Sequence, residues 1–126
     1  RMIGEEVRIF EIVFPNNTNS YDTLFGGHAL SLMDRLAFIV ASRYARKHIV
    51  TARSEKVDFH SPVKEGDLIE LIGRISRVGR TSLTVDIDMF SENLLSGARL
   101  LCTTAEFVMV ALGEDGKPTE VPRPPK

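Results

Sequence analysis

Apolar residues recur along this 126-residue chain with two different periods, and the change of period divides the chain into elements. Alternation of apolar and polar side chains is typical of a half-buried strand, whereas a repeat near 3.6 residues is typical of a helix. The alternating pattern predicts strands over residues 6–14, 49–59, 68–78, 81–90 and 99–112. The helical repeat predicts a single long helix over residues 28–47.

The predicted helix is apolar over an unusually wide arc. At about 100° per residue, one face carries Ala29, Met33, Leu36, Ala37, Val40 and Tyr44. The arc is widened by Leu30, Phe38, Ala41 and Ala45. A helix of this kind is expected to be wrapped by the rest of the chain. Because the strands are joined mostly by short turns, we expect an α+β fold with an antiparallel curved sheet of about five strands around one central helix.

Composition and charge narrow the range of partners. Net charge is −1, and 43% of residues are hydrophobic, which is ordinary for one globular domain over residues 1–126. The tail from about residue 118 is rich in proline and is expected to be extended or disordered. We expect no nucleic-acid partner, no membrane span and no metal site. A single cysteine and the lack of an apolar leader favour a cytoplasmic location.

One carboxylate, Asp34, stands outside the polar strip of the helix. Its neighbours on the same side, Leu30, Phe38 and Ala41, are apolar, so the carboxylate would be partly desolvated. Carboxylates placed against that cost are candidates for a functional role. The alternatives are an ion pair with Arg35, Arg43 or a residue of a partner, and a side chain that reaches water.

Two glycines, Gly26 and Gly27, precede this helix. Glycines at a helix start leave unpaired backbone N–H groups beside the positive end of the helix dipole. A polarised carbonyl oxygen or an anion can bind there. A plain helix cap or a tight packing contact is the alternative.

The whole chain, taken in order, resembles the hotdog-fold acyl-CoA thioesterases of the YciA-like bacterial and cytosolic acyl-CoA hydrolase types. Its helix signature is Asn19-x-x-x-Thr23-Leu-Phe-Gly-Gly-x-x-Leu30-x-x-Met-Asp34. The other matching stretches are Val50-Thr51, Val57-Asp-Phe-His-Ser-Pro62, Gly66-Asp67, Arg77-Val-Gly-Arg-Thr-Ser82, Phe107-Val-Met-Val110 and Gly116-Lys-Pro118. Several motifs in the family order are far more specific than any one of them.

The resemblance implies an enzyme that hydrolyses acyl-CoA to a free fatty acid and CoA. Asp34 would be the general base or nucleophile, and the Gly27 backbone N–H would polarise the thioester carbonyl. Asn19 and Thr51 match polar positions that line the site, although Asn in such a loop often bonds its own backbone. CoA is then part of the substrate, and no separate cofactor is expected. The family places its site at a dimer interface, so we expect a dimer, with dimers assembled into a tetramer or hexamer.

The stretch from Arg77 to Ser82 matches the CoA-binding segment of the family. Its candidate binding residues are Arg77, Gly79, Arg80, Thr81 and Ser82. A tight turn with guanidinium, hydroxyl and backbone N–H groups suits phosphate, whereas composition alone would favour an ordinary solvated hairpin. Two other functions stay open: a non-catalytic acyl-CoA-binding hotdog domain, and a hotdog hydroxyacyl dehydratase.

Overall fold

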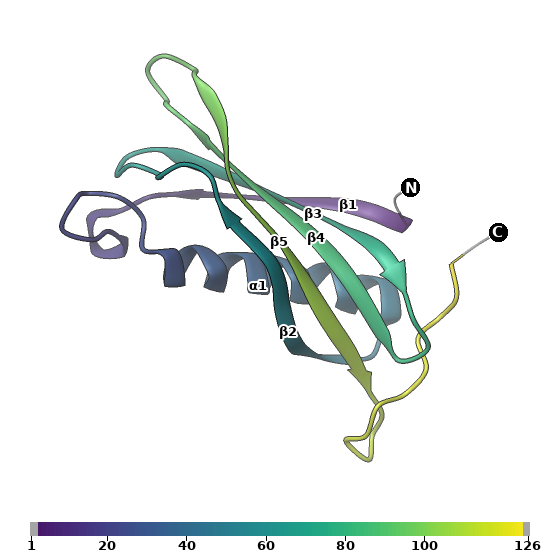
Figure 1. Ribbon diagram of the computed structural model, residues 1–126. Coiled ribbons are helices and arrows are strands. Elements are labelled where there is room, and N and C mark those ends of the chain that lie inside the picture. Colours follow the sequence, from purple (N-terminus) through teal and green to yellow (C-terminus); the bar gives the residue numbers. More distant parts are fainter. Residues whose placement is uncertain (1–2, 125–126) are drawn as a thin grey trace.

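A computed structural model describes residues 3–124, with one long helix and five strands (Figure 1). The order is β1 (Ile3–Ile12), a 3-10 turn (Pro15–Asn17), α1 (Gly26–Ala45), β2 (His48–Phe59), β3 (Leu68–Val78), β4 (Ser82–Glu92) and β5 (Arg99–Leu112). Every predicted strand and the predicted helix are present. In the described part of the chain the one addition is the 3-10 turn, in a loop where no regular structure was expected.

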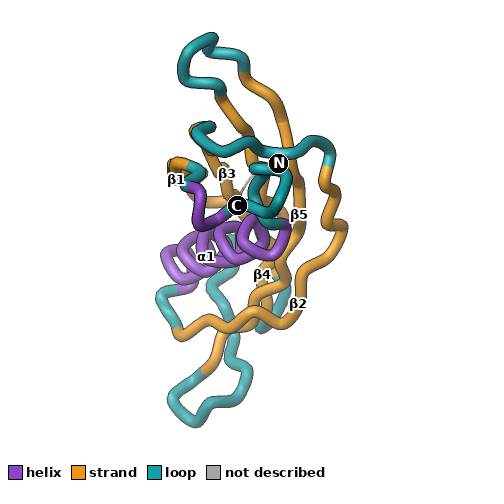
Figure 2. The backbone as a smooth tube through the Cα atoms, turned by 90° about the vertical axis from the view of Figure 1, so that its left-hand side faces the viewer, coloured by secondary structure: helices purple, strands orange, loops and turns teal. Residues whose placement is uncertain are grey.

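The five strands form one antiparallel sheet in the order β1-β3-β4-β5-β2. The two strands that flank the helix in sequence, β1 and β2, are therefore the two edges of the sheet. The helix bridges them by lying across one face of the curved sheet, where it contacts all five strands (Figure 2). The predicted arrangement of a curved antiparallel sheet around one central helix is confirmed.

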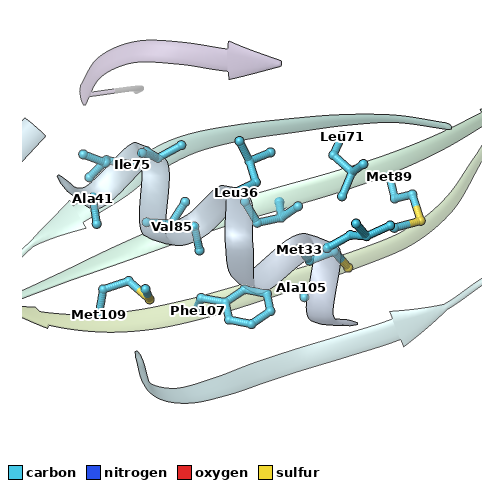
Figure 3. Packing of buried hydrophobic residues seen from close by; sticks show 14 of the residues in the cluster. Met33, Leu36, Ala41, Leu71, Ile75, Val85, Met89, Ala105, Phe107 and Met109 are labelled. Atoms are coloured by element: carbon cyan, nitrogen blue, oxygen red, sulfur yellow. The ribbon is translucent and has the colours of Figure 1, made fainter. Parts of the chain in front are cut away.

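The hydrophobic core lies between the helix and the inner face of the sheet (Figure 3). From the helix, Met33 and Leu36 meet the alternating inward residues of the three central strands. Those strand residues include Leu71, Ile75, Val85, Met89, Ala105, Phe107 and Met109. The expected wide burial of the helix is only partly realised, because Phe38 is 49% exposed. The single chain therefore leaves part of the apolar arc of its helix uncovered.

Several boundaries differ from the prediction. The helix begins at Gly26, two residues before the predicted start. It also ends two residues before the predicted end, because Arg46 adopts a left-handed conformation (φ 54°). The Arg46 N–H closes the last turn by donating to the Ser42 carbonyl at 2.8 Å. Strand β1 begins at Ile3 and ends at Ile12. Val13 pairs instead with the turn before β3, donating its N–H to the Asp67 carbonyl at 3.0 Å.

Candidate active site

Asp34 lies in the third turn of α1, half-buried, and meets the edge strand β2. The Thr51 hydroxyl donates to Asp34 Oδ1 at 2.5 Å. Thr51 is opposite Met109 of β5, which is opposite Leu83 of β4, so its side chain shares the helix-facing side of the sheet with those core residues. The Asp34–Thr51 pair thus joins the helix to the edge of the sheet. Asp34 is partly open to solvent there and lies next to the buried core residue Met33.

The start of α1 has no side-chain cap. Phe25 is the N-cap residue, and the first bond of the helix runs from the Ala29 N–H to the Phe25 carbonyl. The N–H groups of Gly26, Gly27 and His28 precede that bond, and the first turn carries no acidic residue. A Cβ built on Gly27 would meet no atom within 4 Å. This helix end is therefore an uncapped set of donors beside open space, which suits a carbonyl oxygen or an anion.

Asn19 organises the loop that leads into these glycines. Its side-chain oxygen accepts from the Tyr21 N–H at 2.9 Å, the Thr23 N–H at 3.2 Å and the Thr23 hydroxyl at 3.1 Å. Within residues 3–124 no hydrogen bond joins Asn19 to Asp34 or Thr51. The side chain therefore shapes the loop, which was the alternative to a role in the site, and its catalytic role stays a prediction.

The turn between β3 and β4 lies at the other end of the molecule, beside the C-terminal end of α1 (Figure 1). The Gly79 N–H donates to the Ser82 carbonyl at 2.8 Å, and the Thr81 carbonyl accepts from Ala111 at 3.0 Å. The side chains of Arg77 and Arg80 are exposed. Within one chain the structure brings Asp34 and Thr51 together, and it separates Gly27 from the Arg80 turn.

A cavity of about 300 Å³ beside Gly26 was not foreseen in the sequence. Its lining combines the helix start with the end of β2 and the segment that follows, and includes Leu24, Ala29, Phe59 and Val63. The Phe59 ring would lie 3.5 Å from a Cβ on Gly26. A largely apolar cavity next to free N–H groups suits an alkyl chain attached to a polar carbonyl group.

The described part of the chain holds neither a cluster of metal-ligating side chains nor a helix that could cross a membrane. Among residues 3–124, no group of three or more His, Cys, Asp or Glu side chains is arranged to hold a metal ion. Over the same range, α1 is the one long helix, and it is not apolar enough to cross a membrane.

Comparison with known proteins identifies the family. The profile of the Thioesterase superfamily matches residues 21–98, more than half of the chain and the whole of α1 through β4. This chain belongs to the thioesterase superfamily. The resemblance to hotdog acyl-CoA thioesterases and the hotdog fold expected from it are both confirmed.

Relatives of this thioesterase-superfamily chain are longer than the chain itself. A Bacillus subtilis protein described as an uncharacterised acyl-CoA thioester hydrolase is 40% identical over 111 residues, which cover 88% of this chain and 64% of the relative. The acyl-CoA hydrolase of Staphylococcus aureus, solved with butyryl-CoA and CoA, is 32% identical with a TM-score of 0.88, covering 93% of this chain and 71% of that one. A hexameric acyl-CoA thioesterase without ligand is 40% identical with a TM-score of 0.90, covering 93% and 75%.

Proposed function

We propose that this chain hydrolyses the thioester bond of acyl-CoA, releasing a free fatty acid and CoA. The observation that carries the proposal is a carboxylate, Asp34, on the same helix as an uncapped N-terminus at Gly27, in a member of the thioesterase superfamily. Thioester hydrolysis needs a group that activates water or attacks directly, and a donor for the oxyanion that develops. We assign the first role to Asp34 and the second to the Gly27 N–H.

The Staphylococcus aureus hydrolase supports this choice of residues. Its structures include three single substitutions to alanine, of an Asn, an Asp and a Thr. Those three positions are separated by 15 and 17 residues along that chain, as are Asn19, Asp34 and Thr51 here. In our proposal Thr51 orients the Asp34 carboxylate through its hydroxyl, and Asn19 lines the site from the loop before α1.

The spacing along the helix favours a site built from two copies of the chain. Gly27 and Asp34 are seven residues apart, which is about 10 Å along the helix axis. Direct attack would need the carboxylate within about 3.5 Å of the carbonyl carbon and the donor within about 3 Å of its oxygen, a span of roughly 8 Å at most. For direct attack we therefore assign Asp34 of one copy and the Gly27 N–H of the other to the same thioester, and for attack through a water molecule the surface around Asp34 supports the same assignment.

The surface around Asp34 suits such a partner. Thr51 is on β2, an edge strand that has no neighbour on its outer side among residues 3–124. Phe38, Val50 and Phe59 are exposed by 49%, 44% and 56%. An unpaired edge and exposed apolar side chains are commonly covered by association, so we propose a symmetric dimer through β2. The hexameric relative leads us to propose that these dimers assemble into a hexamer.

The Arg80 turn is proposed to bind the nucleotide end of CoA. It presents two exposed guanidinium groups, Arg77 and Arg80, together with the hydroxyl groups of Thr81 and Ser82. Arg80→Ala should raise KM for an acyl-CoA and leave KM unchanged for the same acyl thioester of N-acetylcysteamine, which has no nucleotide. Equal changes for the two substrates would remove Arg80 from the CoA site.

The activity itself is tested by release of free CoA thiol from a series of acyl-CoA chain lengths. The parent protein is compared with Asp34→Asn and Asp34→Ala, and binding of CoA is measured alongside. We expect loss of turnover in both variants with CoA binding kept. Turnover that survives in both variants would refute the role of Asp34, and a parent that binds acyl-CoA without turnover would refute the hydrolase.

A further inference from the structure

The proline-rich tail is docked on the domain. Residues 118–124, here called the C-terminal strap, follow the turn after β5 and run toward the C-terminal end of α1 (Figure 1). The Thr119 N–H donates to the Ala111 carbonyl at 2.9 Å, and the Val121 side chain is buried in the hydrophobic core with 7% exposure. Of the two alternatives expected for this tail, extended or disordered, neither named an anchor, and the buried Val121 supplies one.

Two further hydrogen bonds of the strap reach other elements. The Val121 N–H donates to the carbonyl of Arg80 at 3.0 Å, at the tip of the β3–β4 turn. The Tyr44 hydroxyl, in the last turn of α1, donates to the carbonyl of Pro122 at 2.8 Å. Adjacent strap residues thus connect the Arg80 turn to the helix that carries Asp34.

This connection bears on substrate binding, because one end of it, the Arg80 turn, is the segment that we propose to contact the nucleotide of CoA. Tyr44 is ten residues from Asp34, about 15 Å along the helix axis. A phosphate held by the backbone and guanidinium of a turn is bound well only if the turn is held in place. Besides the strap, the turn is held by the Gly79–Ser82 bond and by the bond between Thr81 and Ala111. In the described residues the Arg80 carbonyl is bonded to the strap alone.

We propose that the C-terminal strap positions the Arg80 turn for the nucleotide of CoA, with Tyr44 and Val121 as positioning residues. The inference rests on the proposed function, in which Arg80 contacts that nucleotide. A positioning role predicts different kinetics from a purely structural role for the strap. A strap that only filled the core would affect stability and treat all thioesters alike, whereas a strap that positions the turn affects only substrates that carry the nucleotide.

The test compares acyl-CoA with the N-acetylcysteamine thioester of the same acyl group in the full chain. Tyr44→Phe keeps the ring and removes the hydroxyl donor, and Val121→Pro keeps an apolar side chain and removes the N–H donor. Both should raise KM for acyl-CoA about two- to tenfold, the range that one hydrogen bond supports, with kcat unchanged. KM for the N-acetylcysteamine thioester should not change. Glu120→Ala, at an exposed neighbour in the strap, is the matched control and should leave both KM values as in the parent.

The outcomes separate this inference from the proposed function. One outcome is that Arg80→Ala raises KM for acyl-CoA alone while Tyr44→Phe leaves both KM values unchanged or raises both equally. In that case the strap inference is wrong and the proposed CoA site stands. If Arg80→Ala is not selective, both fail together. Should Val121→Pro not fold, Tyr44→Phe decides the question.

Discussion

At Gly73 the helix packs closely on the sheet. This glycine lies in the middle of β3 with its missing side chain toward α1. A Cβ built there would lie 2.9 Å from Ile87 Cδ1, 3.0 Å from Leu36 Cγ and 3.0 Å from Val40 Cγ2. The Ile87 atom is the end of a flexible side chain and can rotate away. The other two atoms sit close to the helix backbone, so Gly73→Ala would push the helix off the sheet.

Two opposing effects set how far Gly73→Ala changes the free energy of unfolding. Overpacking of a close-packed core by one methyl group costs about 1–3 kcal/mol. Replacing glycine by alanine within a strand returns about 0.5–1 kcal/mol, because glycine loses more conformational freedom on folding. The net loss in the free energy of unfolding is therefore between about 0 and 2.5 kcal/mol, which for a domain of this size lowers Tm by up to roughly 10 °C.

Urea and thermal unfolding at one fixed protomer concentration measure this loss, since association shifts apparent stability. Gly27→Ala is the matched control, because it makes the same chemical change in a helix where the added Cβ meets open space. The control should unfold at or above the midpoint of the parent. A Gly73→Ala variant as stable as the Gly27→Ala variant would refute the close packing of α1 on β3.

Two other predictions concern the outer face and the site. Burial alone would raise the pKa of Glu70, but hydrogen bonds from Arg8 and Arg99 outweigh it and lower that pKa. Its contribution to stability is therefore full above the unfolded-state pKa of about 4.3 and is lost as the pH falls through the lower folded-state pKa. Glu70→Gln should flatten the acid side of the stability–pH curve, and an unchanged curve would contradict this. Thr51→Val keeps the shape and removes the donor to Asp34 Oδ1, so kcat should fall about ten- to hundredfold, as for a hydrogen bond to a charged group; an unchanged kcat in a steady-state assay would contradict it.

The elements were predictable because their apolar periods are regular. In β4, Leu83, Val85, Ile87 and Met89 alternate with polar residues and all four are buried. The end of the helix was not predictable, because Arg46 is an ordinary helix former, and its left-handed conformation follows from the chain's turn into β2. The burial of Val121 was not predictable, because a single valine between prolines has no apolar period.

The site was only partly visible in the sequence. The apolar neighbours of Asp34 marked it as unusual, but its bond to Thr51 depends on how the fold places the helix against β2. The cavity beside Gly26 combines segments that the fold alone brings together. The exposure of Phe38 also could not be read from periodicity, because an apolar arc does not say whether its own chain or a partner covers it.

Mixing two chains that each carry one inactivating change tests whether Asp34 of one copy and the Gly27 N–H of another act on one thioester. One chain carries Asp34→Asn. The other carries Gly27→Pro, which removes the N–H in the first helical turn, where proline is tolerated. Gly27→Ala, which keeps the N–H, is the control for the added bulk.

The two chains are co-expressed with different tags, the mixed species is isolated, and release of CoA thiol is measured. In a mixed dimer, one site would combine the intact Asp34 of one chain with the intact Gly27 of the other. We expect about half of the parental turnover per dimer, against none for either variant alone. A mixed species as inactive as its two components would contradict the two-copy site.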